Sequence, residues 1–168
     1  MRFTPPVLAL SLAALLTASV GHSAVPTPLD PRAKALVAQG QAALGAGRVD
    51  DAVDAFEAAL TVQPGSPDVL VDLAQATRRQ GMQGKALHYY REALEIDPHD
   101  LTAISGEGAA LAEKGAVDKA RRNLTRLQGL CGANCEQVRE LSAAITRGPV
   151  QRVVTAEPAP DATPTATN

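Results

Sequence analysis

The two cysteines, Cys131 and Cys135, are the residues whose type and spacing most directly suggest chemistry. They flank the short segment GAN, so a disulfide between them would close a very small loop. Two thiols at this spacing could instead stay free, act as a redox pair or help to bind a metal. A redox enzyme would more often place C-x-x-C at a helix start beside a strand, and no strand pattern is visible here. His88 and His99 lie in an earlier part of the chain, so a metal site would lack ligands.

The segment 1–24 has the composition of a secretory signal peptide. Arg2 is its only charged residue, the run at 7–16 is apolar, and small residues follow. This order is typical of a cleaved signal, whereas a membrane span needs about 20 apolar residues. We therefore expect cleavage after Ala24, with cleavage after Gly21 or an uncleaved membrane anchor as the alternatives. The mature protein is then expected to be periplasmic or secreted, without a membrane span.

The expected export bears on the chemistry of Cys131 and Cys135. Disulfides form and persist in oxidising compartments such as the bacterial periplasm. We therefore predict a structural disulfide that fixes the last helix to the rest of the domain. Two free thiols, or a redox or metal role, remain the alternatives. The closed loop is short, so chain entropy predicts a stabilisation of about 2 kcal/mol.

Residues for other chemistry are sparse. No nucleophile, general base and orienting acid can be grouped from the sequence, so we expect no enzymatic activity, no metal and no cofactor. Lys119, Arg122 and Arg126 recur at i, i+3 and i+7 and form one stripe on a helix. The stripe could meet an anionic partner or lipid, but nearby acidic residues favour a solvated face. The formal net charge of −2 argues against a general nucleic-acid partner.

An internal repeat defines the elements that must position these residues. Ala52, Ala86 and Ala120 stand at a constant offset of 34 residues. Chance does not readily align this many positions at one offset. The other aligned sets are Phe56, Tyr90 and Leu124; Ala59 and Ala93; Pro64 and Pro98; Gly47, Gly81 and Gly115; Leu36, Leu70 and Ile104; and Gly40, Ala74 and Gly108.

At these positions the sequence resembles the tetratricopeptide repeat (TPR) family, whose repeat has the same length. The shared features are small residues in the first helix, a glycine before the second, the Ala-x3-aromatic-x2-Ala pattern and a closing proline. The resemblance weakens where Leu127 and Gly132 replace the alanine and the proline, and where Gln39 and Ala43 replace larger apolar residues. It implies an all-α fold, a right-handed α-solenoid of three helix pairs with a C-terminal capping helix.

The expected organisation is one TPR domain at 31–147 between a linker and a tail. Asp30 with Pro31, and Ser66 with Pro67, are expected to cap helices, and glycines are expected to end them. The expected helices are 31–45, 49–63, 67–80, 83–96, 100–114, 116–130 and 136–147. The expected segments are a linker at 25–30, repeats at 33–66, 67–100 and 101–134, a capping helix at 136–147, and a disordered tail rich in Pro, Thr and Ala at 148–168.

Small residues recur where neighbouring helices must cross. Helix axes pack about 8–10 Å apart, and alanine or glycine at the contact allows the short end of that range. We expect Gly40 and Ala52 to bring the helices of one repeat together. Ala59 is expected to admit the next repeat, and Phe56 to fill the space between them. These residues are predicted to serve packing rather than binding.

The resemblance implies a binding surface on the concave side, where the first helices of TPR proteins hold a peptide or partner helix. Some TPR proteins bind a C-terminal carboxylate there with lysine, asparagine and arginine. The corresponding positions here are Val37, Gln41, Asp72, Thr102 and Gly106, so this clamp is expected to be missing. A partly apolar groove with a cationic end at Arg78 and Arg79 is expected instead. The predicted lining is Lys34, Val37, Gln41, Leu44, Asp68, Val71, Gln75, Arg78, Arg79, Thr102, Ser105 and Ala109.

The sequence therefore favours a non-catalytic adaptor or scaffold of the bacterial cell envelope that binds a protein or peptide in this groove. One alternative is a structural accessory subunit of an envelope or secretion assembly that uses its outer faces or its tail. A thiol-disulfide redox protein is the less favoured alternative. The sequence assigns no partner, pathway or oligomeric state, because TPR proteins share an architecture and differ in what they bind.

Overall fold

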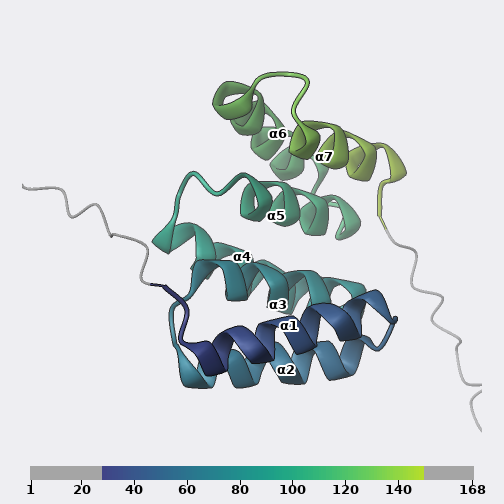
Figure 1. Cartoon of the computed structure of the whole chain (residues 1–168). Helices are drawn as coiled ribbons and strands as arrows, with labels where there is room; N and C mark the ends of the chain where they lie inside the picture. Colours follow the sequence, from purple (N-terminus) through teal and green to yellow (C-terminus); the bar gives the residue numbers. More distant parts are fainter. Residues whose placement is uncertain (1–27, 150–168) are drawn as a thin grey trace, which may run out of the picture.

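The computed structural model describes residues 28–149, which form seven α-helices and no strand (Figure 1). The predicted all-α fold is confirmed, and the ends of each predicted helix differ from the observed ends by at most one residue. The predicted signal peptide at 1–24 and the predicted tail beyond residue 149 lie outside the described residues. The helices are α1 (Pro31–Gly45), α2 (Val49–Val62), α3 (Pro67–Arg79), α4 (Gln83–Ile96), α5 (Leu101–Glu113), α6 (Val117–Cys131) and α7 (Glu136–Arg147). Within residues 28–149, none of them is long and apolar enough to cross a membrane.

Polar residues at the helix starts explain only part of the capping. Asp30 caps α1 as predicted, because its carboxylate accepts a hydrogen bond from the backbone N–H of Arg32 at 2.8 Å. Ser66 occupies the corresponding position before α3, but its side chain accepts no bond from the first turn. The predicted Ser66 side-chain cap is therefore wrong. Ser66 is only 7% exposed. It contributes to the start of α3 through its backbone carbonyl, which accepts a hydrogen bond from the N–H of Leu70 at 3.0 Å.

A glycine in the left-handed conformation follows the first helix of each repeat. Gly47, Gly81 and Gly115 have φ values of +75°, +78° and +84°. Residues with a Cβ rarely adopt this conformation, so glycine is the residue that permits the turn. Each turn reverses the chain and lays the second helix of the repeat antiparallel to the first.

The order of packing produces a curved stack. The two helices of each repeat pack together, α2 packs on α3, and α4 packs on α5. The first helices also contact one another along the row α1, α3, α5 and α7, whereas α2, α4 and α6 make no such contacts within the described residues. The first helices are therefore closer to one another, and they form the concave face (Figure 1).

Two buried rings fill the space between helices, and each lies against a glycine. Phe56 and Tyr90 are both 0% exposed. A Cβ on Gly40 would come within 2.5 Å of the Phe56 ring, and a Cβ on Gly106 would clash with the Tyr90 ring. Phe56 therefore lies close to α1 of its own repeat, whereas Tyr90 lies close to α5 of the next repeat. In each case the glycine makes room for the ring.

The third repeat is completed by α7. Leu127, which replaces the alanine of the earlier repeats, is 0% exposed and packs in one cluster with Val138 and Leu141 of α7. Gly108 lies so close to Leu141 that a Cβ there would approach the leucine Cδ atoms to 2.7 Å. Leu127 is larger than the alanine of the earlier repeats, so it supplies additional apolar surface, and α7 buries that surface.

Candidate functional site

The concave face carries two adjoining hollows. The larger has a volume of about 910 Å³ and lies between α1, α3 and the start of α5. The smaller has a volume of about 430 Å³ and lies between α3, α5 and α7. Gln75 and Thr102 line both hollows, so the two form one groove along the first helices. We call the hollows the larger hollow and the smaller hollow below.

The structure brings nearly all of the predicted groove residues to these hollows. Leu44 is the exception: it packs against the core cluster of the first repeat and lines neither hollow. Its apolar side chain is better accommodated in that core than on a wet surface. In the larger hollow lie Lys34, Val37, Gln41, Asp68, Val71, Gln75 and Thr102. In the smaller hollow lie Gln75, Arg78, Arg79, Thr102, Ser105 and Ala109.

Helix α7 also lines the groove, a contribution that its predicted role as a capping helix does not include. Residues Glu140, Ala143, Ala144 and Arg147 of α7 line the smaller hollow, and Gln137 lines the larger. A signal was present, because Leu36, Leu70, Ile104 and Val138 continue the offset of 34 residues into α7. The helix therefore occupies the place of the first helix of a fourth repeat. The loop residues Pro28, Leu29, Asp97 and Asp100, and Leu101 at the start of α5, were missed as well.

The larger hollow is acidic. Asp68, Asp72, Asp97 and Asp100 line it, and Lys34 is the one cation among its lining residues in the described part of the chain. Burial raises the pKa of the Asp72 carboxyl, and a hydrogen bond opposes this effect, because the Gln41 amide donates to Asp72 Oδ2 at 3.0 Å. Asp100 also caps α5 by accepting the N–H groups of the first turn. Positive or neutral groups of a ligand suit this end of the groove.

The smaller hollow has the opposite charge. Arg78, Arg79 and Arg147 line it, with Glu140 as the opposing carboxylate. Arg78 Nη1 donates to Glu113 Oε1 at 2.7 Å, and the two side chains are 26% and 18% exposed. The cationic end predicted at Arg78 and Arg79 is thus present in the lining and is extended by α7.

Tyr90 lies at the floor of the smaller hollow. Burial raises the pKa of its hydroxyl to about 12, although the Arg78 guanidinium group acts in the opposite direction. The hydroxyl is therefore neutral at physiological pH. The Arg78 guanidinium group is close enough to the Tyr90 hydroxyl to lower its pKa, but within the described residues no hydrogen bond of ordinary geometry joins the Tyr90 hydroxyl or Arg78 Nε to a partner.

The five positions that correspond to the carboxylate clamp of other TPR proteins all line the groove, but none of them is cationic. They are Val37, Gln41, Asp72, Thr102 and Gly106. Asp72 even places a carboxylate at one of them. These side chains provide no charge to bind a carboxylate at the positions of that clamp.

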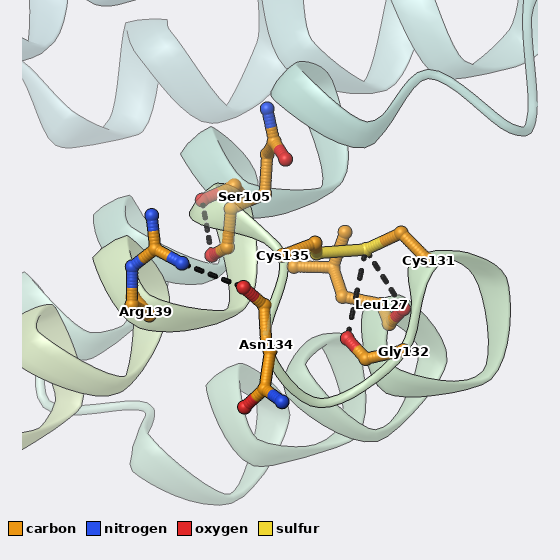
Figure 2. The surroundings of a disulfide bond; sticks show 8 residues. Ser105, Leu127, Cys131, Gly132, Asn134, Cys135 and Arg139 are labelled. Atoms are coloured by element: carbon orange, nitrogen blue, oxygen red, sulfur yellow. Dashed lines mark hydrogen bonds between the residues drawn. A yellow bond between two sulfur atoms is a disulfide. The ribbon is translucent and has the colours of Figure 1, made fainter.

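Cys131 and Cys135 lie at the junction of α6 and α7 and are joined through their sulfur atoms, as Figure 2 shows. Cys131 ends α6, and Cys135 is the residue before α7. The Cα atoms are 5.9 Å apart. Two hydrogen bonds support the same junction: Arg139 Nη1 donates to the Asn134 carbonyl at 2.6 Å, and Ser105 Oγ donates to the Gln137 carbonyl at 3.2 Å.

The remaining candidates lie apart from the groove lining. His88 has a side chain that is 74% exposed, and its Nε2 atom is 3.8 Å from Glu92. No cluster of three or more His, Cys, Asp or Glu residues that could hold a metal occurs in residues 28–149. Lys119, Arg122 and Arg126 are exposed on α6, where the Arg126 guanidinium group donates to the Pro98 carbonyl.

Solved TPR domains share this arrangement of helices. The first TPR domain of Spaghetti (RPAP3), bound to the HSP90 peptide SRMEEVD, has a TM-score of 0.62 and 21% identity, and the match covers 73% of this chain and 98% of that chain. The TPR2B domain of yeast Sti1, in a complex with pHsp70, has a TM-score of 0.65 and 17% identity, covering 70% of this chain and 96% of that one. At these identities the likeness shows the fold alone.

A family model matches the middle of the chain. Residues 37–100 match the model of the tetratricopeptide repeat. These residues are tetratricopeptide repeats. The matched residues contain Gly40, Ala52 and Tyr90, the small residues and the ring that pack the first two repeats.

Two curated relatives match over similar lengths. The Protein CTR9 homolog of Arabidopsis thaliana is 31% identical over 101 residues, which are 60% of this chain and 9% of the relative. Cellulose synthase 2 operon protein C of Komagataeibacter xylinus is 38% identical over 99 residues, which are 58% of this chain and 8% of the relative. The matched part of this TPR protein thus spans less than a tenth of either relative.

Proposed function

We propose that this TPR protein is a non-catalytic adaptor or scaffold of a bacterial cell envelope and that it binds a segment of a partner protein in the concave groove. TPR domains are protein-interaction modules, and two similar structures are complexes with HSP90 or Hsp70 ligands. The observation that carries the proposal is the pair of adjoining hollows along α1, α3, α5 and α7. Their opposite charges would orient a bound segment, because complementary charges fix register more than they add affinity.

The envelope location rests on sequence features and on one relative. The signal-peptide pattern at 1–24 supports export. The name of the Komagataeibacter relative connects it with cellulose synthase, which motivates a role in an envelope assembly. The net charge of −2 and the mixed charges of the groove favour a protein partner over nucleic acid.

In-cell photo-crosslinking tests the groove. A photo-reactive amino acid at Thr102, which is exposed and lines both hollows, is expected to crosslink one discrete partner. The same amino acid at His88, whose side chain is 74% exposed on α4, is the matched control and should give no such product. Mass spectrometry identifies the crosslinked protein. A partner that crosslinks from His88 and not from Thr102 would contradict the groove and favour use of the outer face.

We also propose that Cys131 and Cys135 form a structural disulfide in the exported protein. Its proposed role is to hold α7, and with it one wall of the smaller hollow, against α6. Replacing both cysteines with serine is expected to lower the free energy of unfolding by about 2 kcal/mol, because the unfolded chain regains loop entropy. Urea denaturation followed by circular dichroism measures the loss.

Reductant gives the matched control for the disulfide. Dithiothreitol should destabilise the native sequence by a similar amount and leave the double serine variant unchanged. Equal stability of the native protein with and without reductant would contradict a structural role. Alkylation followed by mass spectrometry, on protein taken from the periplasm, shows directly whether the two thiols are bonded.

A further inference from the structure

The smaller hollow has features of an anion-binding subsite that the groove as a whole does not share. Its lining carries Arg78, Arg79 and Arg147 against a single carboxylate, Glu140, in the described part of the chain. Arg78 is already paired with Glu113, but Arg79 and Arg147 form no ion pair within residues 28–149. Two guanidinium groups are thus left with unmatched charge at one end of the groove.

Two buried polar groups at the same place lack partners. Tyr90 is 0% exposed, and its hydroxyl makes no hydrogen bond of ordinary geometry among the described residues, although the Arg78 guanidinium group lies close enough to lower its pKa. Arg78 Nε likewise has no acceptor. A buried polar group without a partner destabilises a fold, so such groups in a native protein call for an explanation. Both groups can donate, and a guanidinium group cannot accept. A ligand that only accepts hydrogen bonds would satisfy them.

A carboxylate meets these requirements. It accepts several hydrogen bonds, carries negative charge and pairs with guanidinium groups in a bidentate geometry. Tyr90 and Arg78 Nε are closed to solvent in this arrangement, so a side chain above them has to turn when the carboxylate enters. Arg79 is exposed and forms no ion pair within residues 28–149, so its guanidinium group is free to turn toward the entering carboxylate.

The neighbouring hollow suggests what delivers the carboxylate. A segment that lies in the larger hollow continues into the smaller one past Gln75 and Thr102. The larger hollow is acidic and repels an acidic side chain. The smaller hollow, which is lined by arginines, is therefore the favoured place for an acidic side chain of the segment. We infer that the smaller hollow binds an aspartate or glutamate side chain of the partner segment, with Arg79 and Arg147 as its main charge partners and Tyr90 as a donor at its floor. This inference rests on the proposed function, and its residues are not those of the carboxylate clamp positions.

Phage-displayed random peptides supply a probe that needs no known partner. Peptides selected on the full protein are expected to share an Asp or Glu at one position. Changing that residue to Asn or Gln should weaken binding about tenfold in fluorescence anisotropy, because hydrogen bonds to charged groups are stronger than those between neutral groups. The double variant Arg79→Gln/Arg147→Gln should bind the acidic peptide about tenfold more weakly and no longer distinguish acid from amide.

Matched variants separate a binding role from a structural one. Arg121→Gln/Arg122→Gln removes two exposed arginines from the outer helix α6 and should leave peptide affinity unchanged. Tyr90→Phe keeps the ring and removes only the unpartnered hydroxyl. It is expected to leave stability unchanged or raised, and to weaken the acidic peptide severalfold relative to its amide counterpart. A residue with a merely structural role would not change this ratio.

The outcomes distinguish the two proposals. If no peptide is enriched, or if enriched peptides still bind Thr102→Trp, in which the groove is blocked, the proposed function and the inference fail together. If peptides are blocked by Thr102→Trp but carry no acidic preference, the groove stands and the subsite is overturned. An acidic preference that survives Arg79→Gln/Arg147→Gln overturns the subsite as well.

Discussion

The variant Tyr90→Ala is expected to lose about 3–5 kcal/mol of unfolding free energy, the cost of removing a large buried aromatic side chain. The ring is 0% exposed and belongs to the cluster that joins α3, α4 and α5. Its removal leaves a cavity beside Gly106, which has no side chain to fill it. Domains have only about 5–15 kcal/mol of stability, so this variant should be close to unfolded at room temperature or melt far below the native protein.

Tyr89 offers a matched control for this prediction, because it is the same residue type at the next position. It is only partly buried, and its ring lies 5.7 Å from the Lys85 ammonium group and beside His88. Tyr89→Ala is expected to cost less, about 1–2 kcal/mol, since the partly buried ring packs only at the edge of two core clusters and keeps contact with solvent. Urea denaturation curves followed by circular dichroism give both values. Equal losses for the two variants would contradict the assignment of Tyr90 as the central core ring.

The sequence predicted the helices well because their ends are marked by residues with few conformational options. Pro31 and Pro67 begin helices, and glycines follow the ends of α1, α3 and α5. The sequence did not predict whether each ring lies against a glycine of its own repeat or of the next repeat. Phe56 lies against Gly40 of its own repeat, whereas Tyr90 lies against Gly106 of the next repeat, and both rings also share clusters with residues of α3. This difference follows from three-dimensional packing and not from the repeat offset.

The candidate groove was predictable to the extent that it follows the repeat. The offset placed the lining of α1, α3 and α5, because equivalent positions of stacked helices face the same way. The sequence did not predict the contribution of α7, because a helix without a partner helix is expected only to cover apolar area. Leu44 was wrongly predicted to line the groove, because the repeat offset predicts which way a side chain points and not how deeply it is buried. In the end repeat this apolar side chain packs against the core. The Cys131–Cys135 disulfide of the exported protein and the export itself stay predictions until they are measured.

The close contact between Gly40 and Phe56 yields a second large effect. Gly40→Val is expected to cost about 3 kcal/mol, because even a Cβ would come within 2.5 Å of Phe56 Cε1, and overpacking strains a core. Phe56 is 0% exposed, so the ring cannot relieve the clash by turning into solvent without a shift of its neighbours. Gly45 ends the same helix, and a Cβ added there would meet no heavy atom within 4 Å. Gly45→Val should therefore stay within about 1 kcal/mol of the native protein.

A double variant tests whether the ring itself causes the loss. Phe56→Leu shortens the side chain opposite Gly40 and should cost about 1 kcal/mol alone, as a change of shape in the core. Combined with Gly40→Val, it removes most of the clash, so the double variant should be more stable than the sum of the two single losses predicts. Thermal and urea unfolding of the four proteins measure this coupling. Strict additivity, or a Gly40→Val variant as stable as Gly45→Val, would show that α1 and α2 do not approach each other through this glycine, and the packing of the first repeat would have to be revised.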